Sequence, residues 1–298
     1  MMRLISNRMA RREAITGYIF ASPWIIGFVL FTAYPIVASI IYSFMDYNIL
    51  ETPRWIGIKN YIDLINDRTF WLSLGNTCYY VIFNVPLNMI IGLSIALLLS
   101  MDIKGIAVYR TLYYMPSIVP LVASSVLWSW IFNPNFGILT HTVRLLGLTP
   151  PAWLSDPKWA KPSLIIMSLW GAGGGMIIYL AGLKNIPRTY YEAAELDGAS
   201  VWRKFIHVTL PMLSPTLFFQ LIMGLIGSFQ VFTQAFVMTG GGPNESTLFY
   251  VLYLYRNAFQ FWKMGYASAM AWVLFVIIMF LTWLNFVISK YWVFYDQA

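Results

Sequence analysis

Six long stretches of the chain contain no charged side chain, and each is long enough to cross a lipid bilayer. A helix rises about 1.5 Å per residue, so roughly 20 residues cross a hydrocarbon core of about 30 Å. Hydrocarbon offers the backbone no hydrogen-bond partner, so each stretch is expected to form a helix. The six predicted spans are residues 18–45, 73–100, 111–132, 162–183, 214–238 and 267–289.

The composition supports this prediction. Of the 298 residues, 59% are hydrophobic and 10% are charged, against about 25% charged in an ordinary soluble domain. These values exclude a soluble enzyme, a disordered protein and a fibrous protein, and the single Cys78 excludes a disulfide framework or a cysteine-based metal cluster. We therefore predict an all-α integral membrane protein. Residues 1–17 form a basic N-terminal segment, and residues 18–298 form a single transmembrane domain with six transmembrane helices.

The distribution of Lys and Arg predicts the orientation. With the N-terminus inside, the inside segments hold 11 of these residues in 66 positions, and the outside segments hold 8 in 84. Cationic residues concentrate on the cytoplasmic side of membrane proteins. Both termini are therefore expected in the cytoplasm, and the net charge of +7 is explained by the membrane rather than by nucleic acid.

Several common functional motifs are absent. No predicted span contains Asp, Glu, Lys, Arg or His, whereas ion-driven transporters usually carry an ionisable group at membrane depth. No H-E-x-x-H occurs, and the glycines between Gly171 and Gly175 lack the Lys that completes a phosphate-binding loop. No catalytic residue, resident cofactor or metal site is predicted. If ATP drives this protein, another chain must bind it.

The inside loop 185–213 carries the most specific local pattern. Pro187 interrupts any continuation of the preceding helix, and Thr189 is a candidate N-cap with Glu192 at capping-box spacing. Gly198 can end this short helix in a left-handed cap. Ser200 then opens a second helix, which Pro211 ends or kinks. A stiff helix carrying small alanines favours a protein docking element over an ordinary surface loop.

This loop resembles the signature loop of permease subunits of ATP-binding-cassette importers. The pattern is E-A-A-x3-G-x9-[I/V]-x-L-P, and it is met by Glu192, Ala193, Ala194, Gly198, Val208, Leu210 and Pro211. Asp197 fits the common D-G-A form. The stretch T-G-G-G-P from Thr239 to Pro243 and the stretch S-P-W-I-I-G-F from Ser22 to Phe28 are similar to the carbohydrate branch, and to the maltose-type first permease within it.

The resemblance implies a mechanism and a set of partners. The loop would be a cytoplasmic coupling helix between transmembrane helices 4 and 5, and it would dock on an ATPase subunit through Glu192, Ala193, Ala194, Asp197 and Gly198. The chain would pair with a second, related permease, two ATPases that bind ATP and Mg, and an extracytoplasmic solute-binding protein at the outside loops, above all 239–266. The expected location is the prokaryotic cytoplasmic membrane.

Polar side chains in the fourth and fifth spans suggest the substrate path. Amides and hydroxyls in hydrocarbon require a partner or a cavity, and Gln230 and Gln234 lie at helical spacing. The resemblance places sugar contacts on the helices before and after the coupling loop, although the aligned positions Met167 and Val231 are not polar. Asn84 and Asn88 are interpreted as packing. The predicted substrate contacts are Trp170, Gly171, Gly174, Ser228, Gln230 and Gln234.

The predicted function is therefore that of a permease subunit in a binding-protein-dependent importer of a di- or oligosaccharide. One alternative is the same machinery importing glycerol phosphate or another small polar solute, for which basic residues near the cavity would be expected. A second alternative, from another class, is a secondary transporter or a channel, which needs no docking loop.

Overall fold

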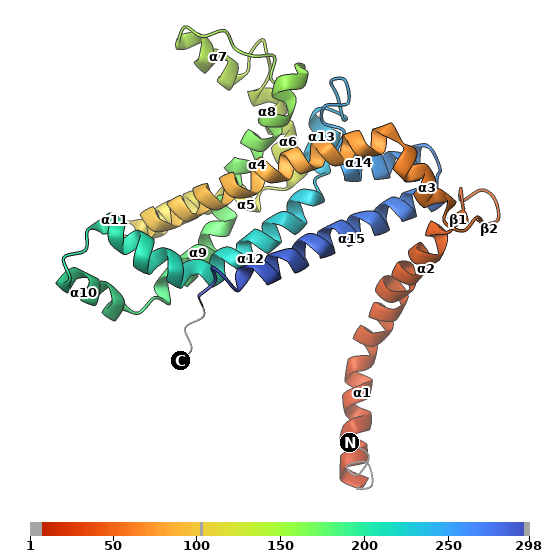
Figure 1. Ribbon diagram of the computed structural model, residues 1–298, viewed down its shortest axis with the longest axis horizontal. Helices are drawn as coiled ribbons and strands as arrows, with labels where there is room; N and C mark the ends of the chain where they lie inside the picture. The colour runs from red at the N-terminus through yellow and green to blue at the C-terminus, as the bar shows by residue number, and fades with distance from the viewer. Residues whose placement is uncertain (1–7, 102–103, 295–298) are drawn as a thin grey trace. The chain divides into compact units, whose positions relative to one another are not determined.

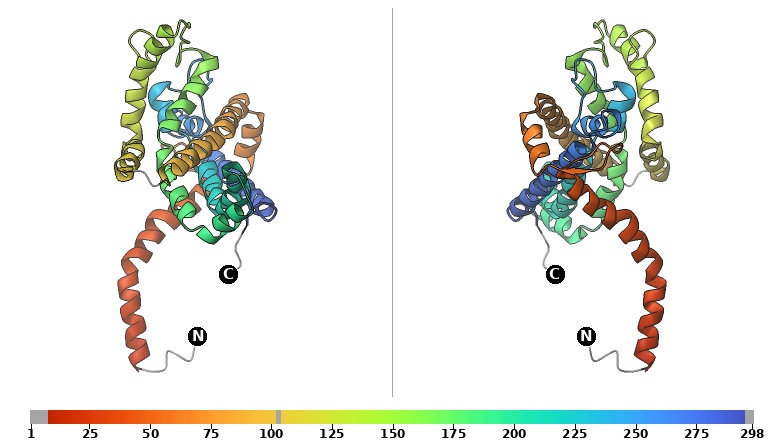
Figure 2. Two further views of the ribbon diagram at one scale, coloured as in Figure 1. Left: turned by 90° about the vertical axis from the view of Figure 1, so that its left-hand side faces the viewer. Right: turned by 90° about the vertical axis from the view of Figure 1, so that its right-hand side faces the viewer.

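The computed structural model describes residues 8–101 and 104–294. Residues 1–7 of the predicted basic segment, and the last four residues of the predicted permease domain, lie outside the described residues. Helices dominate the described chain (Figures 1 and 2). Within it, the strands are β1 (Met45–Asp46) and β2 (Arg54–Trp55), which pair antiparallel. The predicted all-α fold class is confirmed.

Four helical segments of the described chain are long and apolar enough to cross a membrane without a sharp bend, at Arg11–Ser43, Arg68–Leu99, Val201–Met238 and Met264–Ser289. The first contains α1 (Arg8–Phe28) and α2 (Tyr34–Ser43), and the second is α4. The third contains α11 (Val201–Lys204), α12 (Leu210–Phe229) and α13 (Thr233–Met238), and the fourth is α15.

Two further candidate spans are bent pairs of helices. Helices α5 (Ile106–Ile118) and α6 (Leu121–Ile131) meet at 96°, and α8 (Pro157–Trp170) and α9 (Gly173–Lys184) meet at 50°. Counted as one span each, they bring the total to six, the predicted number. The prediction of continuous helices over 111–132 and 162–183 is wrong, however. Val119 is extended before Pro120, as sterics before a proline favour, and the second break falls at Gly171 and Ala172.

Other prolines are accommodated without a break. A π-helical stretch at Val29–Ala33 precedes Pro35, and another at Phe205–Thr209 precedes Pro211. A proline cannot donate a backbone hydrogen bond, and a π-bulge is one way in which a helix adjusts locally. Pro211 therefore lies in the first turn of α12 and does not end the helix. The remaining helices are α3 (Lys59–Asn66), α7 (Ile138–Leu145), α10 (Arg188–Leu196), α14 (Tyr250–Tyr255) and a π-helical stretch at Arg256–Gln260.

The chain forms two compact units. The first contains residues 1–66 and 257–273, and its interior is organised around a close backbone approach. Asn60 donates from Nδ2 to the carbonyl oxygens of Ser43 and Met45, both at 2.9 Å. Gly265 donates its backbone N–H to the Tyr47 carbonyl at 3.1 Å. A Cβ atom at Gly265 would lie 2.0 Å from the Met45 carbonyl oxygen, so only glycine fits there.

The second unit contains residues 67–256 and 274–298. Its central helix is α4, which packs along α8, α9, α12 and α14. The Asp67 carboxylate caps α4 by accepting a hydrogen bond from the Thr69 N–H at 2.8 Å. Tyr80 of α4 belongs to a cluster of almost fully buried side chains that includes Leu164, Phe249 and Ala235. This helix therefore provides the frame against which the other helices of the unit are positioned.

We predict that Gly265→Ala destabilises the protein by about 1–3 kcal/mol, the range seen for overpacking, because the new methyl group would clash with the Met45 carbonyl. Thermal unfolding in detergent measures the change. Gly75→Ala in α4 is the matched control, since a Cβ there meets nothing within 4 Å. If both variants unfold at the wild-type temperature, the close approach at Gly265 is not structurally important.

Candidate functional site

A cavity of about 390 Å³ lies within the second unit. Helix α4 forms one wall, the break between α8 and α9 forms another, and α12 together with the segment leading into α13 forms the third. Two of these walls contain interruptions of helical structure, at Gly171–Ala172 and at Val231. In a membrane, irregular backbone is tolerated where it lines a cavity rather than lipid.

One hydrogen-bond network joins three walls of the cavity. Asn84 of α4 donates from Nδ2 to Ser228 Oγ of α12 at 3.0 Å, and its Oδ1 accepts a hydrogen bond from Ser168 Oγ of α8. Asn88, one turn further along α4, donates to Asn84 Oδ1 at 2.8 Å. All four side chains line the cavity, so a ligand would meet a connected set of amides and hydroxyls.

Further polar groups line other parts of the wall. Gln234 of α13 donates from Nε2 to the Tyr80 hydroxyl at 3.1 Å. Gln220 of α12 donates from Nε2 to the Gly175 carbonyl at 3.3 Å. Tyr179 lines the cavity with only 1% of its surface exposed. Uncharged side chains of this kind hydrogen-bond to hydroxyl groups as donors and as acceptors.

The residues that the structure describes around this cavity include no Asp, Glu, Lys, Arg or His. Its polar lining therefore consists of amides, hydroxyls and backbone groups. Such a set can recognise a neutral, hydroxyl-rich solute, but it offers no counter-charge to a phosphate or a carboxylate. Over the whole described part of the chain, no group of three or more His, Cys, Asp or Glu residues is placed to hold a metal ion.

The structure places three of the six predicted substrate contacts, Gly171, Ser228 and Gln234, in the cavity wall. The other three lie elsewhere. Trp170 stacks edge-on against Trp128, with 6.2 Å between ring centroids. A Cβ at Gly174 would lie 3.1 Å from Ser117 Cβ, so this glycine permits α9 to approach α5. Gln230 is exposed.

The expectation that Gln230 and Gln234 share a helix face is wrong. Helix α12 ends at Phe229 and α13 begins at Thr233, because Phe232 leaves helical geometry with φ −141° and ψ −62°. This interruption separates the two amides, so Gln234 turns into the cavity wall while Gln230 stays exposed.

Sequence reasoning missed several cavity residues. Asn84 and Asn88, which the sequence predicts to serve packing, do bond to one another, but both also line the cavity. Their amides within an uncharged span were the available signal. The remaining polar residues of the wall are not among the six predicted substrate contacts. They are Tyr80, Ser168, Tyr179 and Gln220.

The loop 185–213 contains a short helix with a well-defined end. Helix α10 runs from Arg188 to Leu196. Gly198 has φ +73°, as predicted, and donates its N–H to the Glu195 carbonyl at 3.0 Å, while Ala199 donates to the Ala194 carbonyl at 2.9 Å. These two bonds form a Schellman motif. The predicted N-cap at Thr189 is wrong, because the N-cap position is Pro187.

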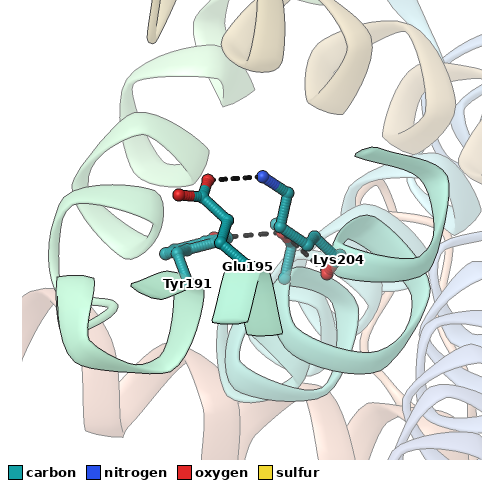
Figure 3. Close-up of polar contacts among 4 residues, drawn as sticks. Tyr191, Glu195 and Lys204 are labelled. Atoms are coloured by element: carbon teal, nitrogen blue, oxygen red, sulfur yellow. Dashed lines mark hydrogen bonds and ion pairs between the residues drawn. The ribbon is translucent and has the colours of Figure 1, made fainter. Parts of the chain in front are cut away.

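Two side-chain contacts connect α10 to the helix that follows (Figure 3). Lys204 Nζ lies 2.6 Å from Glu195 Oε1, and the Tyr191 hydroxyl lies 3.0 Å from Thr209 Oγ1. Ser200 caps α11 as predicted, accepting a hydrogen bond from the Arg203 N–H at 3.4 Å. The pair Lys204–Glu195 is largely solvent-exposed on the Glu195 side, so it fixes orientation more than it adds stability.

The predicted coupling residues lie together on this element. Glu192, Ala193, Asp197 and Gly198 are exposed, and Ala194 is half-buried. Leu196 is 91% exposed and Trp202 is 68% exposed. The loop therefore presents small and apolar residues together with the carboxylates of Glu192 and Asp197. Such exposed patches mark interaction sites in soluble regions of proteins.

The loop that begins with the T-G-G-G-P stretch and runs on to Phe249, here termed the T-G-G-G-P loop, is bonded to α4 through its later residues. Asn76 donates from Nδ2 to the Glu245 carbonyl at 2.8 Å and to the Leu248 carbonyl at 3.2 Å. The Tyr250 N–H donates to Thr77 Oγ1 at 2.9 Å. Four residues spaced by one turn, Asn76, Tyr80, Asn84 and Asn88, form what we term the α4 polar stripe. It reaches from this loop to the cavity.

The described chain thus combines a cavity at interrupted helices with an exposed, capped helix in one loop. The family described as "Binding-protein-dependent transport system inner membrane component" matches residues 88–291. The chain belongs to this family. It is therefore a permease subunit of an ATP-binding-cassette importer, and a multi-pass component of the inner membrane.

Relatives match along almost the whole chain. The probable ABC transporter permease protein YesP of Bacillus subtilis is 43% identical over 98% of this chain and 96% of its own length. The lactose transport system permease protein LacF of Rhizobium radiobacter is 34% identical, over 95% and 97%. The trehalose/maltose transport system permease protein MalF of Thermococcus litoralis is 32% identical, over 93% and 95%.

A solved structure shows the same fold. A chain of a bacterial ABC transporter involved in the import of the acidic polysaccharide alginate superposes with a TM-score of 0.80 at 23% identity. The match covers 95% of this chain and 99% of that chain.

We predict that Asn84→Ala lowers the free energy of unfolding by about 1–2 kcal/mol. Hydrogen bonds between membrane helices contribute about 0.6 kcal/mol on average and at most about 1.7, and this substitution removes the bonds to Ser168 and Ser228. Thermal unfolding in detergent is the measurement. Asn285→Ala is the control, because Asn285 donates only to Leu281 within its own helix. An equal effect in both variants would show that the cavity network adds nothing.

Proposed function

We propose that this chain is one of two permeases of an ATP-driven importer of neutral di- or oligosaccharides. The observation that carries the proposal is the cavity lined by connected amides and hydroxyls with no charged group among the described lining residues. Three relatives are named for the uncharged sugars lactose, trehalose and maltose, and arabinooligosaccharides, and one is named for the anionic sulfoquinovosyl glycerol. The sugar contacts proposed from the predicted set are Gly171, Ser228 and Gln234.

Coupling to ATP hydrolysis is proposed to occur through α10. In this scheme two ATPase subunits bind ATP and Mg in the cytoplasm, and each presents a cleft to one permease. Glu192, Ala193, Ala194, Asp197 and Gly198 would fill that cleft. The Schellman cap and the contacts to Lys204 and Thr209 make α10 and the start of the next span move together. Movement of the ATPases would therefore pass to α11 and α12 instead of being absorbed in the loop.

We predict that Gly198→Arg inserts into the membrane but abolishes transport-coupled ATP hydrolysis, because the long cation would occupy the docking surface. ATPase activity of the purified importer, stimulated by the loaded binding protein, is the measurement. Gly105→Arg is the control, since Gly105 also has a positive φ and open space around it. Gly105→Arg introduces the same charge and the same strain of a positive φ, but at a position outside α10. Normal stimulated ATPase activity in Gly198→Arg would contradict the assignment.

A second prediction tests the sugar site. Gln234→Leu removes a cavity amide and should raise KM for uptake about tenfold, as expected for one lost hydrogen bond near the upper end of the usual range. Uptake of labelled sugar into proteoliposomes with saturated binding protein measures it. The same substitution at the exposed Gln230 should leave KM unchanged. Unchanged KM in Gln234→Leu would remove this residue from the substrate path.

The partner subunits are also part of the proposal. None of the residues in the most apolar window of Arg11–Ser43 is buried, so this span requires lipid or a second permease to cover it. The fixed T-G-G-G-P loop offers a preformed surface for a solute-binding protein. Both termini are proposed to lie in the cytoplasm, which places α10 on the side where ATP is available.

The alternatives predict different results. An importer of glycerol phosphate would place cations in the cavity, and none is found among its described lining residues. A secondary transporter would purify without an ATPase and would stop when an ionophore dissipates the ion gradients. The proposed importer retains an ATPase subunit on purification, and its uptake into proteoliposomes depends on enclosed ATP.

A further inference from the structure

A second hollow lies between α5 and α9, away from the sugar cavity. Its volume is about 470 Å³, and most of its wall is apolar. The apolar residues that line it are Tyr114, Ile118, Met176, Ile177, Leu180 and Ala181. We term it the α5–α9 groove. None of its residues belongs to the sugar cavity or to the predicted coupling set.

The residues at the opening of the groove are exposed and apolar. Ile118 is 65% exposed and Ile177 is 47% exposed. Both α5 and α9 belong to helix pairs with the length and composition of membrane spans. Isoleucines exposed on such helices meet lipid chains or another protein, since water would be unfavourable for this much apolar surface. The groove is therefore suited to an apolar occupant in the membrane.

One end of the groove is cationic. Arg110, in the second turn of α5, and Lys184, the last residue of α9, both line it. Arg110 is held in place by donating from Nη2 to the Leu99 carbonyl at 2.8 Å, and its Nε is buried without a hydrogen-bond partner. Within residues 8–101 and 104–294, neither cation makes an ion pair. The groove thus combines two cations that lack a carboxylate partner among the described residues with an apolar wall.

We propose that the α5–α9 groove binds an anionic phospholipid, with the phosphate at Arg110 and Lys184 and an acyl chain along the apolar wall. Arginine pairs with phosphate through a planar fork of donors, and lysine adds a point charge. Basic pockets between membrane helices on the cytoplasmic side are suited to such head groups. The proposal uses the cytoplasmic orientation of the proposed function, which puts both cations at the inner membrane surface.

The dimensions agree with this occupant. From Arg110 to Ile118, α5 rises about 12 Å at 1.5 Å per residue. The head group would lie at the level of the cations, and the first half of an acyl chain would follow the helix toward the bilayer centre. A zwitterionic lipid would bring its own cation near Arg110 and Lys184, so the groove should prefer a lipid with a net negative head group.

Lipid binding to the purified full-length chain with its associated subunits tests the proposal. Phosphatidylglycerol is titrated in detergent, and bound lipid is counted by native mass spectrometry. Arg110→Gln and Lys184→Gln should each weaken phosphatidylglycerol binding about fivefold, given roughly 1 kcal/mol per cation, and should leave phosphatidylcholine binding unchanged. Ala181→Trp, which fills the exposed apolar wall without altering charge, should also weaken phosphatidylglycerol binding.

Lys290→Gln is the matched control, because Lys290 is exposed at the end of α15 and lies outside the groove. Its phosphatidylglycerol binding should equal that of the wild type. An equal loss in Lys290→Gln would reduce the effect to general surface charge and overturn the proposal, as would unchanged binding in both groove variants. The assay needs no transport, so its failure is distinguishable from a failure of the proposed importer function.

Discussion

The inability of hydrocarbon to hydrogen-bond with the backbone decides most of this structure. It forces almost every residue between the loops into helix, and it restricts interruptions to places where other groups meet the freed carbonyls and amides. Two interruptions, at Gly171–Ala172 and at Gln230–Phe232, coincide with the cavity of the second unit. The cavity is therefore not a gap between uninterrupted helices. It exists where two helices stop and resume, and amide and hydroxyl side chains line its wall.

Much of the fold could be predicted from the sequence, because uncharged stretches of 22 residues or more leave few alternatives. The positions of the breaks could not. Prolines occur at Pro35, Pro120 and Pro211, yet only Pro120 stands at a sharp bend. The other two are absorbed by π-helical stretches. A proline removes one backbone donor in every case, and the tertiary surroundings decide whether the helix bends or widens.

The two functional regions differed in how well the sequence described them. The end of α10 depends on local chemistry, so Gly198 and Ser200 could be assigned their capping roles directly. The cavity depends on which helix faces meet, and that information is not local. Ser228 and Gln234 line it, whereas Gln230 does not, because a non-helical Phe232 lies between them. Asn84 was set aside as packing for the same reason, since its partners lie 84 and 144 residues away in the chain.

The α4 polar stripe has a mechanical consequence. Asn76 donates to the carbonyls of Glu245 and Leu248, and Asn88 lies about 18 Å further along the same helix, at 1.5 Å per residue. Displacement of the T-G-G-G-P loop would therefore reach the cavity amides as an axial or rotational movement of one continuous helix. A protein that docks on this loop would thus reset the spacing of amides deep in the bilayer without touching them.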